Sequence, residues 1–391
     1  LQNKKWQYWK AASEFSSPLI MTKKNCYIGV LSGTSIDALD LALITIDGEH
    51  IKLLHCYNHP FPSTLRKRLQ TLCTPSANEL VEFGLADREF ALVAGQAVQQ
   101  LMTLSGLQAS DIAAIGSHGQ TIRHHPELTP AFSLQLGCPA TLAATTGIAV
   151  VSHFRQKDIA LGGQGAPLAP ALHHALFHTS EQNRVVINLG GIANISWLPA
   201  QGEVIGFDCG PANTLLDAWY QKHHIDKYYD ANGDWARSGK VNQALLQLFL
   251  TDPYFKLAPP KSTGREYFTL AWLACYLERH SSYVSAVDVQ ATLLELTATS
   301  VVQALAEFAP ASQAYLCGGG VHNKKLIQCL QRLAPQITWQ STAELGVDPD
   351  WVEAILFAWL ARCHVESLMG SLTAVTGASR PAVLGSYTPA L

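Results

Sequence analysis

The chain has 391 residues, of which 48% are hydrophobic and 15% are charged, and its formal net charge is -3. This composition is typical of a globular protein and excludes an intrinsically disordered chain. The small negative charge and the lack of a basic run offer no electrostatic surface for nucleic acid or for an anionic membrane, so we expect a small-molecule partner.

The first residues and the cysteines bear on the start of the fold and on the compartment. We expect residues 1–20 to be an extension outside the fold, because Met21-Thr-Lys-Lys-Asn25 resembles a natural start. The 9 cysteines have no C-x-x-C spacing and lie mostly in apolar stretches, which indicates reduced core thiols. No apolar run approaches the roughly 18 residues that a membrane helix needs. We therefore expect a cytoplasmic protein.

The first glycine turn follows a predicted buried strand at Tyr27–Leu31 and precedes a second predicted strand at residues 40–47. A strand on both sides of the turn favours a hairpin over a dinucleotide-binding fold, in which a helix follows the glycines. Small residues let backbone N–H groups approach a phosphate, and Asp37 is the first candidate ligand of Mg²⁺, with Asp40 as the second. An ordinary hairpin turn is the alternative. The predicted nucleotide-binding turn comprises Gly33, Thr34, Ser35, Ile36, Asp37, Ala38, Leu39 and Asp40.

A polar loop is predicted at the end of the next strand. Apolar residues at helical spacing predict a helix over about residues 75–107, and a short buried strand then leads into Ser117-His-Gly-Gln-Thr121. Ligands bind at strand ends in open α/β sheets, so His118 and Gln120 are candidate substrate-binding residues. A purely structural role is the alternative.

A second polar cluster follows a predicted strand at residues 148–151. Arg155 is a candidate to pair with a substrate carboxylate in bidentate geometry. Asp158 is a further candidate substrate-binding residue and a second candidate general base. It ranks below Asp208 as a base because Arg155 or Lys157 is close enough in sequence to neutralise it. This cluster, too, has a purely structural alternative.

The second half of the chain repeats the strand, glycine turn and strand of the first half over residues 184–197. The repeat indicates a duplicated α/β fold of two similar domains with a central cleft between them. We expect residues 21–150 to form the N-terminal domain, with about 370–391 as a candidate addition, and 151–369 to form the C-terminal domain. The second turn supplies four further candidate nucleotide-binding residues, namely Asn188, Gly190, Gly191 and Asn194.

A third glycine turn, Gly318-Gly319-Gly320, separates a predicted strand at residues 314–317 from a predicted helix that begins near Asn323. Flat glycine backbone there suits one face of an adenosine, and Asn323 either caps the helix or reaches a hydroxyl group. A structural turn is the alternative for this motif when it is considered alone. We therefore expect the adenosine site in the C-terminal domain.

Two carboxylates are the candidate catalytic residues. Asp208 lies between a predicted strand and a predicted helix, where it is suited to act as a general base toward water or a sugar hydroxyl. Glu353 lies on an otherwise apolar face of a predicted helix, where an unpaired charge is costly, and this favours a role in the cleft. The structural alternatives are a turn aspartate and a first-turn acid favoured by the helix dipole.

Seven motifs in a fixed order resemble those of the anhydro-N-acetylmuramic acid kinases, a branch of the sugar kinase, Hsp70 and actin superfamily. The resemblance covers the chain from Met21 and implies a two-domain actin-like ATPase fold. The motifs are Gly33-Thr-Ser-Ile-Asp37, Ser117-His-Gly-Gln-Thr121, Phe154-Arg155 with Asp158, Gly162-Gly-Gln-Gly-Ala-Pro167, Asn188-Leu-Gly-Gly-Ile-Ala-Asn194, Phe207-Asp-Cys-Gly-Pro211 and Cys317-Gly-Gly-Gly320.

The resemblance also implies an activity. ATP and water, with Mg²⁺, would convert 1,6-anhydro-N-acetylmuramic acid to N-acetylmuramic acid 6-phosphate in peptidoglycan recycling. Asp208 matches the aspartate that activates water for attack at the anomeric carbon, and Glu353 would help to orient that water and the sugar. The resemblance further suggests a homodimer. Two alternatives stay open: a kinase of another amino sugar with the same fold, and a nucleotide-gated binding or assembly protein.

Overall fold

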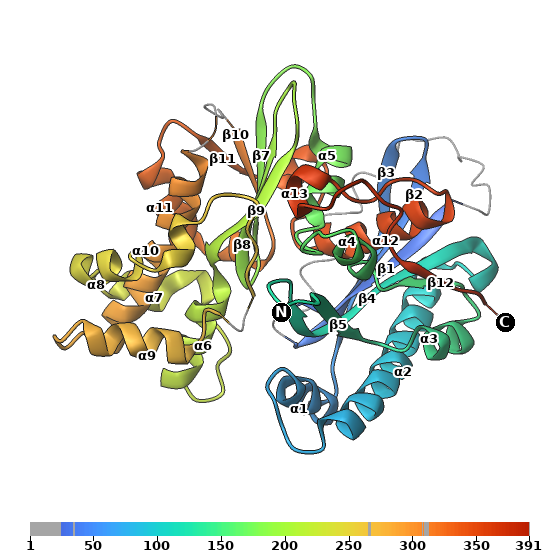
Figure 1. Ribbon diagram of the computed structural model, residues 1–391, viewed down its shortest axis with the longest axis horizontal. Coiled ribbons are helices and arrows are strands. Elements are labelled where there is room, and N and C mark those ends of the chain that lie inside the picture. The colour runs from blue at the N-terminus through green and yellow to red at the C-terminus, as the bar shows by residue number, and fades with distance from the viewer. Residues whose placement is uncertain (1–24, 34–35, 265–266, 307, 309–312, 391) are drawn as a thin grey trace.

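The protein is described here from a computed structural model, which covers residues 25–33, 36–264, 267–306, 308 and 313–390. The predicted extension at residues 1–20 lies outside the described residues, and so do Thr34 and Ser35 of the first glycine turn. Within the described ranges the chain forms two β-sheets, each flanked by helices, and Figure 1 shows the two units next to each other.

The first sheet contains the first glycine turn. Its order is β12-β6-β4-β1-β2-β3, with β5 paired to β4. The turn joins β1 to β2, which are antiparallel, whereas β4 runs parallel to β1 and to β6. The bounds of its strands are β1 (Cys26–Leu31), β2 (Ala38–Asp47), β3 (His50–Pro60), β4 (Ile112–His125), β5 (Phe132–Leu136), β6 (Val150–Ser152) and β12 (Ser386–Thr388).

The second sheet repeats this topology, in the order β11-β10-β7-β8-β9. The strands β7, β8 and β9 form antiparallel pairs, and β10 runs parallel to β7 and to β11, as β4 does to β1 and β6. The predicted α/β fold with a duplicated core is therefore confirmed. The bounds are β7 (Arg184–Leu189), β8 (Ile192–Leu198), β9 (Ile205–Pro211), β10 (Gln313–Cys317) and β11 (Thr338–Ser341).

The helices divide between the two units. Those that contact the first sheet are α1 (Ser63–Leu72), α2 (Glu79–Ser105), α3 (Pro139–Thr146), α4 (Gln156–Ala160) and α12 (Val352–Val365). Two helices of the same part of the molecule, α5 (Ala169–Phe177) and α13 (Thr373–Thr376), contact β8 and β9 of the second sheet. The others are α6 (Asn213–His223), α7 (Asp234–Ser238), α8 (Gln243–Phe249), α9 (Leu270–Arg279), α10 (Ala286–Leu305) and α11 (Lys324–Leu333). None of the described helices is both long and apolar enough to cross a membrane.

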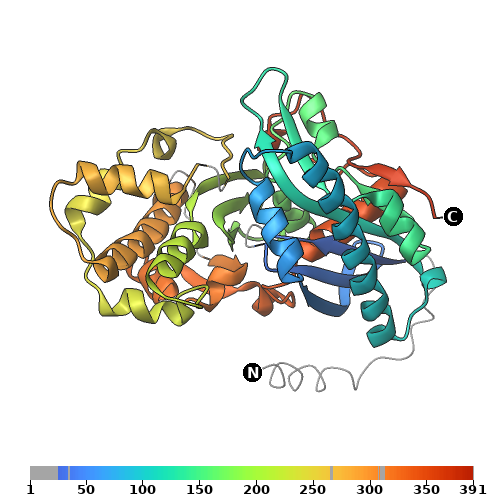
Figure 2. The ribbon, with the colours of Figure 1, turned by 90° about the horizontal axis from the view of Figure 1, so that it is seen from below.

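Three apolar cores hold these layers together. One joins α1, α2 and α3 to the outer face of the first sheet, and another joins α6 to α11 to the outer face of the second. Figure 1 and Figure 2 both show α8 to α11, in yellow to orange, on the side away from the first unit. The third core lies between the sheets and contains α5 and α12 together with Val186, Leu198 and Cys317 of the second sheet. The two units therefore share a common core.

Two predicted strand boundaries are wrong. The strand β4 does not end before the Ser117–Thr121 motif but continues through it to His125, so His118 and Gln120 are strand residues. Asp208 likewise lies within β9 and not in the loop after it. In both cases glycine and polar residues continue the extended backbone, because β4 pairs with β5 and β9 pairs with β8 along these segments.

The domain boundaries at residues 150 and 369 stay a prediction. Two contacts bear on them: β12 pairs with β6 of the first sheet, and α12 packs against β1, β2 and β4. We therefore propose that residues 352–390 belong to the first unit, which extends the predicted addition at about 370–391.

Glycines allow α12 to approach the first sheet closely. A Cβ at Gly29 of β1 would clash with the carbonyl oxygen of Ala354, and a Cβ at Gly116 of β4 would clash with that of Phe357. Both clashes are with helix backbone, which cannot rotate away as a side chain can. These two glycines therefore set the distance between α12 and the sheet.

We predict that Gly116→Ala lowers the free energy of unfolding by about 1–3 kcal/mol, because the added methyl group overpacks this contact. Urea unfolding measures the change. The control is Gly84→Ala in α2, where a Cβ meets nothing within 4 Å. This control should be stabilising by about 0.5–1 kcal/mol, as expected for alanine in a helix interior. Equal stabilities of Gly116→Ala and the wild type would disprove the close-packing argument.

A buried histidine lies in the shared core. His173 of α5 is 0% exposed, and its Nδ1 lies 2.7 Å from Oγ of Ser196 in β8. Burial lowers the pKa of His173 to about 3. The unfolded chain takes up the proton near pH 6.5, so between about pH 6.5 and 3 the unfolded state binds a proton that the folded state excludes. The contribution of His173 to stability is thus complete above pH 6.5 and decreases as the pH falls.

We therefore predict that His173→Gln reduces the loss of stability between pH 7.5 and pH 5.5 by about 1–1.5 kcal/mol relative to the wild type. Urea unfolding at the two pH values measures it, and the comparison of differences cancels any change in stability that does not depend on pH. If the wild type and the variant lose stability equally, His173 already binds its proton in the folded state, contrary to our interpretation.

Candidate active site

The first glycine turn is described only in part. Ile36 is buried with a left-handed backbone (φ 51°), and its N–H donates to the carbonyl oxygen of Gly33 at 3.3 Å. Ala38 and Leu39 are buried at the start of β2, so their side chains face the core and only their backbone can face a ligand. Asp37 is exposed. This geometry is compatible with the predicted phosphate-binding turn, which stays a prediction.

Acidic side chains gather beside this turn. Burial is the main cause that raises the pKa of Asp40 to about 7, and the negative charges of Asp37, Glu353 and Asp350 raise it further. The hydrogen bond from Asn58 Nδ2 to Asp40 Oδ1, of 2.7 Å, acts in the opposite direction. Mutual repulsion of this kind favours binding of a cation between the carboxylates.

The donor set of this acidic group fits Mg²⁺. The described residues contain no group of three or more His, Cys, Asp or Glu side chains placed to hold a metal ion. Mg²⁺ is commonly held by only one or two carboxylates, with water and substrate phosphate oxygens as its other ligands. Asp37, with Asp40 nearby, offers this kind of partial site.

Glu353 lies in the first turn of α12, as the predicted helix placed it. The surrounding protein raises the pKa of Glu353 by desolvation, whereas the positive charge of Arg155 and a hydrogen bond with the Asn188 side chain lower it. The side chain nevertheless remains exposed to solvent. Glu353 is thus an acid that is enclosed by protein on several sides yet accessible to a ligand.

The second glycine turn lies against the third. Asn188 and Asn194 are direct partners across the β7–β8 hairpin, and a Cβ at Gly318 would clash with Asn188 Oδ1. The tip is fixed by the start of α6, because the carbonyl oxygens of Gly190 and Gly191 accept hydrogen bonds from the N–H groups of residues 212–214 at 2.9–3.0 Å. The fold therefore brings these two predicted turns together, with Glu353 beside Asn188.

The third turn has the predicted order of strand, glycines and helix. Gly318 is left-handed (φ 78°), and its N–H donates to the carbonyl oxygen of Pro349 at 2.9 Å. Gly319 is exposed, Gly320 is buried, and Asn323 caps α11 by accepting from the N–H of Leu326 at 3.0 Å. Of the two roles proposed for Asn323, the structure has the helix cap.

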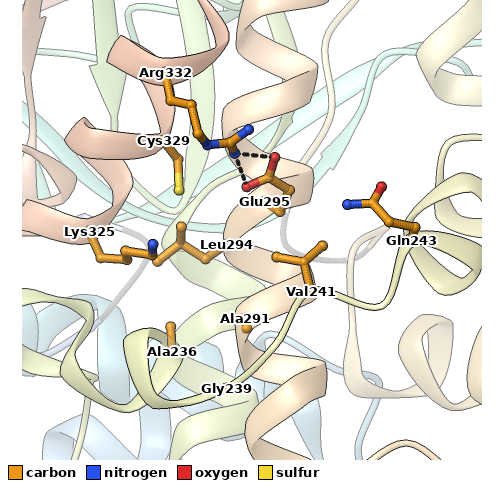
Figure 3. A pocket seen from close by; sticks show the side chains of 10 residues that line it. All are labelled: Ala236, Gly239, Val241, Gln243, Ala291, Leu294, Glu295, Lys325, Cys329 and Arg332. Carbon is orange, nitrogen blue, oxygen red and sulfur yellow. Dashed lines mark hydrogen bonds and ion pairs between the residues drawn. The ribbon is translucent and has the colours of Figure 1, made fainter.

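A cavity of about 190 Å³ extends along the helix that follows this turn (Figure 3). It lies between α7, α10 and α11, and its lining includes Lys325 and the ion pair between Arg332 and Glu295. The side chain of Glu295 is only 6% exposed. None of the predicted site residues lines this cavity. It is therefore distinct from the predicted site in its residues.

Asp208 is buried in β9, with 7% of its surface exposed. Its Oδ2 accepts a hydrogen bond from the N–H of Thr263 at 2.9 Å, and its own N–H donates to the carbonyl oxygen of Lys261 at 3.1 Å. Tyr254 Oη donates to the carbonyl oxygen of Asp208 at 2.6 Å. We did not predict these supporting residues. The only sequence signal for them is the small polar stretch Ser262-Thr263-Gly264 after two prolines.

Arg155 and His118 form one unit. The Nε and one terminal nitrogen of Arg155 donate to His118 Nε2 at 3.2 and 3.0 Å, and its other terminal nitrogen donates to the carbonyl oxygen of Gly165 at 2.8 Å. Because Nε2 accepts, the proton of His118 is on Nδ1, 3.0 Å from the carbonyl oxygen of Gly119. Burial, followed by the charge of Arg155, lowers the pKa of His118 well below its usual value. His118 is therefore neutral.

The charge of Arg155 faces the acids of the site. Burial lowers the pKa of Arg155, while the negative charges of Asp208, Glu353 and Asp158 act in the opposite direction. The positive charge of Arg155 thus interacts with the negative charges of both candidate catalytic carboxylates, Asp208 and Glu353. Its role as a partner of a substrate carboxylate stays a prediction.

The other two predicted substrate-binding residues are engaged inside the protein. Gln120 is 3% exposed, accepts a hydrogen bond from Ser32 Oγ and donates to the carbonyl oxygen of Thr121. Asp158 is 0% exposed, and its two oxygens accept from Thr376 Oγ1 at 2.7 Å and from the N–H of Gly165 at 2.8 Å. We therefore revise the expectation for Asp158 from a substrate-binding residue or base to a support of the loop at residues 161–167.

The family model and the relatives compared by sequence agree with the resemblance seen in the motifs. Among solved structures, the activator of the 2-hydroxyisocaproyl-CoA dehydratase from Clostridium difficile has a TM-score of 0.45 at 10% identity, with 88% of this chain and 96% of that chain covered. An anhydro-N-acetylmuramic acid kinase of Shewanella pealeana is 46% identical over 367 residues, which are 94% of this chain and 99% of that protein. One of Shewanella sp. (strain ANA-3) is 48% identical over 363 residues, 93% and 98% of the two chains. The family model described as anhydro-N-acetylmuramic acid kinase matches residues 25–390. The chain therefore belongs to the anhydro-N-acetylmuramic acid kinase family.

Proposed function

We propose that this protein opens the 1,6-anhydro bridge of 1,6-anhydro-N-acetylmuramic acid with water and phosphorylates the sugar with ATP. The product would be N-acetylmuramic acid 6-phosphate, in peptidoglycan recycling. Membership of the family makes the protein a kinase, a phosphotransferase that uses ATP. The observation that carries the substrate proposal is that the negative charges of two carboxylates, Asp208 and Glu353, both act on the same cation, Arg155.

Two carboxylates are what the proposed reaction needs. A kinase that acts on a free hydroxyl needs one base for that hydroxyl, whereas opening the bridge requires a base that activates water and a second group that orients this water. In the proposed step Asp208 accepts a proton from water, and the oxygen of that water bonds to the anomeric carbon. The bond from that carbon to O6 breaks, O6 attacks the γ-phosphorus, and ADP leaves. Glu353 orients the water and the sugar. The sugar thus gains one water and one phosphoryl group.

The glycine turns are proposed to hold the nucleotide. Backbone N–H groups of the first and second turns would bind phosphate oxygens, and the third turn would support the adenosine. When bound, Mg²⁺ would offset the charge on the phosphates, held by Asp37 with Asp40 nearby. The mutual repulsion of the acidic side chains at these positions supports this assignment.

We further propose a cytoplasmic homodimer, on the strength of the family resemblance. One described surface supports self-association: α2 carries exposed apolar side chains on its outer face, at Leu80, Val81, Leu85 and Leu92. Apolar side chains gathered on one helix in this way are typical of protein contact surfaces.

We predict that the protein releases ADP from Mg-ATP only when 1,6-anhydro-N-acetylmuramic acid is present, and that mass spectrometry finds a product heavier than the sugar by one water and one phosphoryl group. The control substrate is N-acetylmuramic acid, whose bridge is already open. Turnover of another amino sugar but not of the anhydro sugar would favour the alternative kinase. If no sugar is turned over and ATP instead controls the binding of another protein, the assembly hypothesis replaces both.

We predict that Asp208→Asn lowers kcat by about 10²–10⁴-fold, because it removes the base without changing the shape of the side chain. The KM for ATP should change little. Glu353→Gln should lower kcat/KM for the anhydro sugar by about tenfold or more, since it removes one of the groups that orient the water and the sugar. Steady-state kinetics measure both changes.

The matched control for these two variants is Asp234→Asn at the exposed start of α7, which should leave the kinetics unchanged. Full activity of Asp208→Asn would exclude Asp208 as the base. Unchanged kinetics of Glu353→Gln would show that the helix acid has only a structural role.

A further inference from the structure

The carboxylate of Asp208 is supported by a short segment that has no regular structure of its own. The carbonyl oxygen of Lys261 accepts a hydrogen bond from the N–H of Asp208 at 3.1 Å, and the N–H of Thr263 donates to Asp208 Oδ2 at 2.9 Å. Residues 261–263 lie between the short helix at Pro253–Lys256 and α9, outside any helix or strand. Their position, and with it the direction of the hydrogen bond to Oδ2, depends on contacts with other elements.

The middle residue of this segment is tied to a distant loop. Ser262 Oγ donates to Gln164 Oε1 at 2.7 Å, across 98 residues of sequence. Gln164 lies in the loop at residues 161–167, between α4 and α5. Both partners are half-buried, so water competes less for this hydrogen bond than it would at an exposed site.

The loop that carries Gln164 is itself fixed. The N–H of Gln164 donates to the carbonyl oxygen of Thr376 at 2.8 Å. The neighbouring Gly165 donates to the buried carboxylate of Asp158, which also accepts from the Thr376 hydroxyl. In addition α13, which contains Thr376, packs against β9, the strand of Asp208, and Figure 1 shows the two next to each other. The amide of Gln164 is therefore presented from a backbone with little freedom.

The same loop also reaches the cation of the site. The carbonyl oxygen of Gly165, the residue after Gln164, accepts a hydrogen bond from Arg155 at 2.8 Å. The charge of Arg155 in turn acts on Asp208 and Glu353. The same loop thus contacts Arg155 through the carbonyl oxygen of Gly165. Through the side chain of Gln164 it contacts the segment that supports Asp208.

We propose that Gln164 is a positioning residue for Asp208. Its side-chain oxygen holds Ser262, and this fixes the N–H of Thr263 in the direction of Asp208 Oδ2. Gln164 acts through Ser262 and Thr263 and not on the substrate. The inference rests on the proposed function in one respect, namely that Asp208 is the base. Because a reacting group displaced by about 1 Å can lose on the order of 10²-fold in rate, a single indirect hydrogen bond has a measurable effect.

The test uses the full chain and the variants Gln164→Ala, Ser262→Ala and the double variant. Each single substitution breaks the same hydrogen bond, so we expect each to lower kcat about tenfold and the double variant to lower it no further, as is typical of two residues that act as one unit. The KM for ATP and the midpoint of thermal unfolding should stay near the wild-type values. Ser262→Thr keeps the hydroxyl and should restore most of kcat. Gln96→Ala, at an exposed position of α2, is the matched control.

A second measurement does not depend on turnover. Hydrogen exchange of the Thr263 amide, followed by mass spectrometry of peptides that span residues 257–268, should be faster in Gln164→Ala and in Ser262→Ala than in the wild type and in Gln96→Ala. This result with the expected kinetics supports the proposal. If exchange at Thr263 is unchanged, or if the losses in kcat multiply in the double variant, the proposal is wrong.

The failure of this inference can be distinguished from failure of the proposed function. If the wild type does not act on the anhydro sugar, the proposed function fails, and the exchange of Thr263 still decides whether Gln164 orders the segment. If the wild type is active and Gln164→Ala is equally active, only the positioning role fails. An effect of Gln164→Ala on the KM for the sugar alone would instead place Gln164 against the substrate and would overturn the indirect role.

Discussion

The site depends above all on the close approach of α12 to the first sheet. Gly29 and Gly116 allow the helix backbone to lie directly on β1 and β4, because any side chain at these positions would clash with a carbonyl oxygen of the helix. The helix begins at Val352, so its distance from the sheet fixes where Glu353 stands relative to Asp40. Burial is the main cause that raises the pKa of Asp40 to about 7, and the further contribution from the charge of Glu353 follows from this packing.

The positive charge of Arg155 offsets the negative charge of the acids in the site, and the neutral His118 accepts hydrogen bonds from Arg155. Arg155 faces three carboxylates, and its guanidinium is held by His118 and by a backbone oxygen. A protonated His118 would repel Arg155 and would have no lone pair to accept its hydrogen bonds. The burial that keeps His118 neutral therefore keeps Arg155 in place. His118 and Arg155, which we expected to bind substrate, thus have a structural task in the fold.

The motifs predict the duplicated fold well because hairpins and their glycine turns are local features. Each of the two patterns of strand, glycine turn and strand predicted one antiparallel pair, namely β1–β2 and β7–β8. The length of β4 and the position of Asp208 were not predictable from local sequence, because a polar or glycine residue in a strand looks the same as one in a loop until its partner strand is known. The segment at residues 261–263 was missed for a related reason: its importance comes from contacts with Asp208 and Gln164, which are far away in sequence.

The two carboxylates come from different units of the duplicated fold. Each half supplies a similar hairpin, but Asp208 lies on β9 of the second sheet, whereas Glu353 lies on a helix that packs on the first. Their separation is therefore set by the core between the sheets, in which α12 meets Val186 and Cys317. A rotation of one unit relative to the other would change the distance between the two acids without altering either hairpin. The hydrogen bond between Gln164 and Ser262 joins the same two units on the side of Asp208. An interior that is close-packed resists such a rotation, because small shifts create voids or clashes, so the geometry of the two acids is determined by packing that neither motif contains.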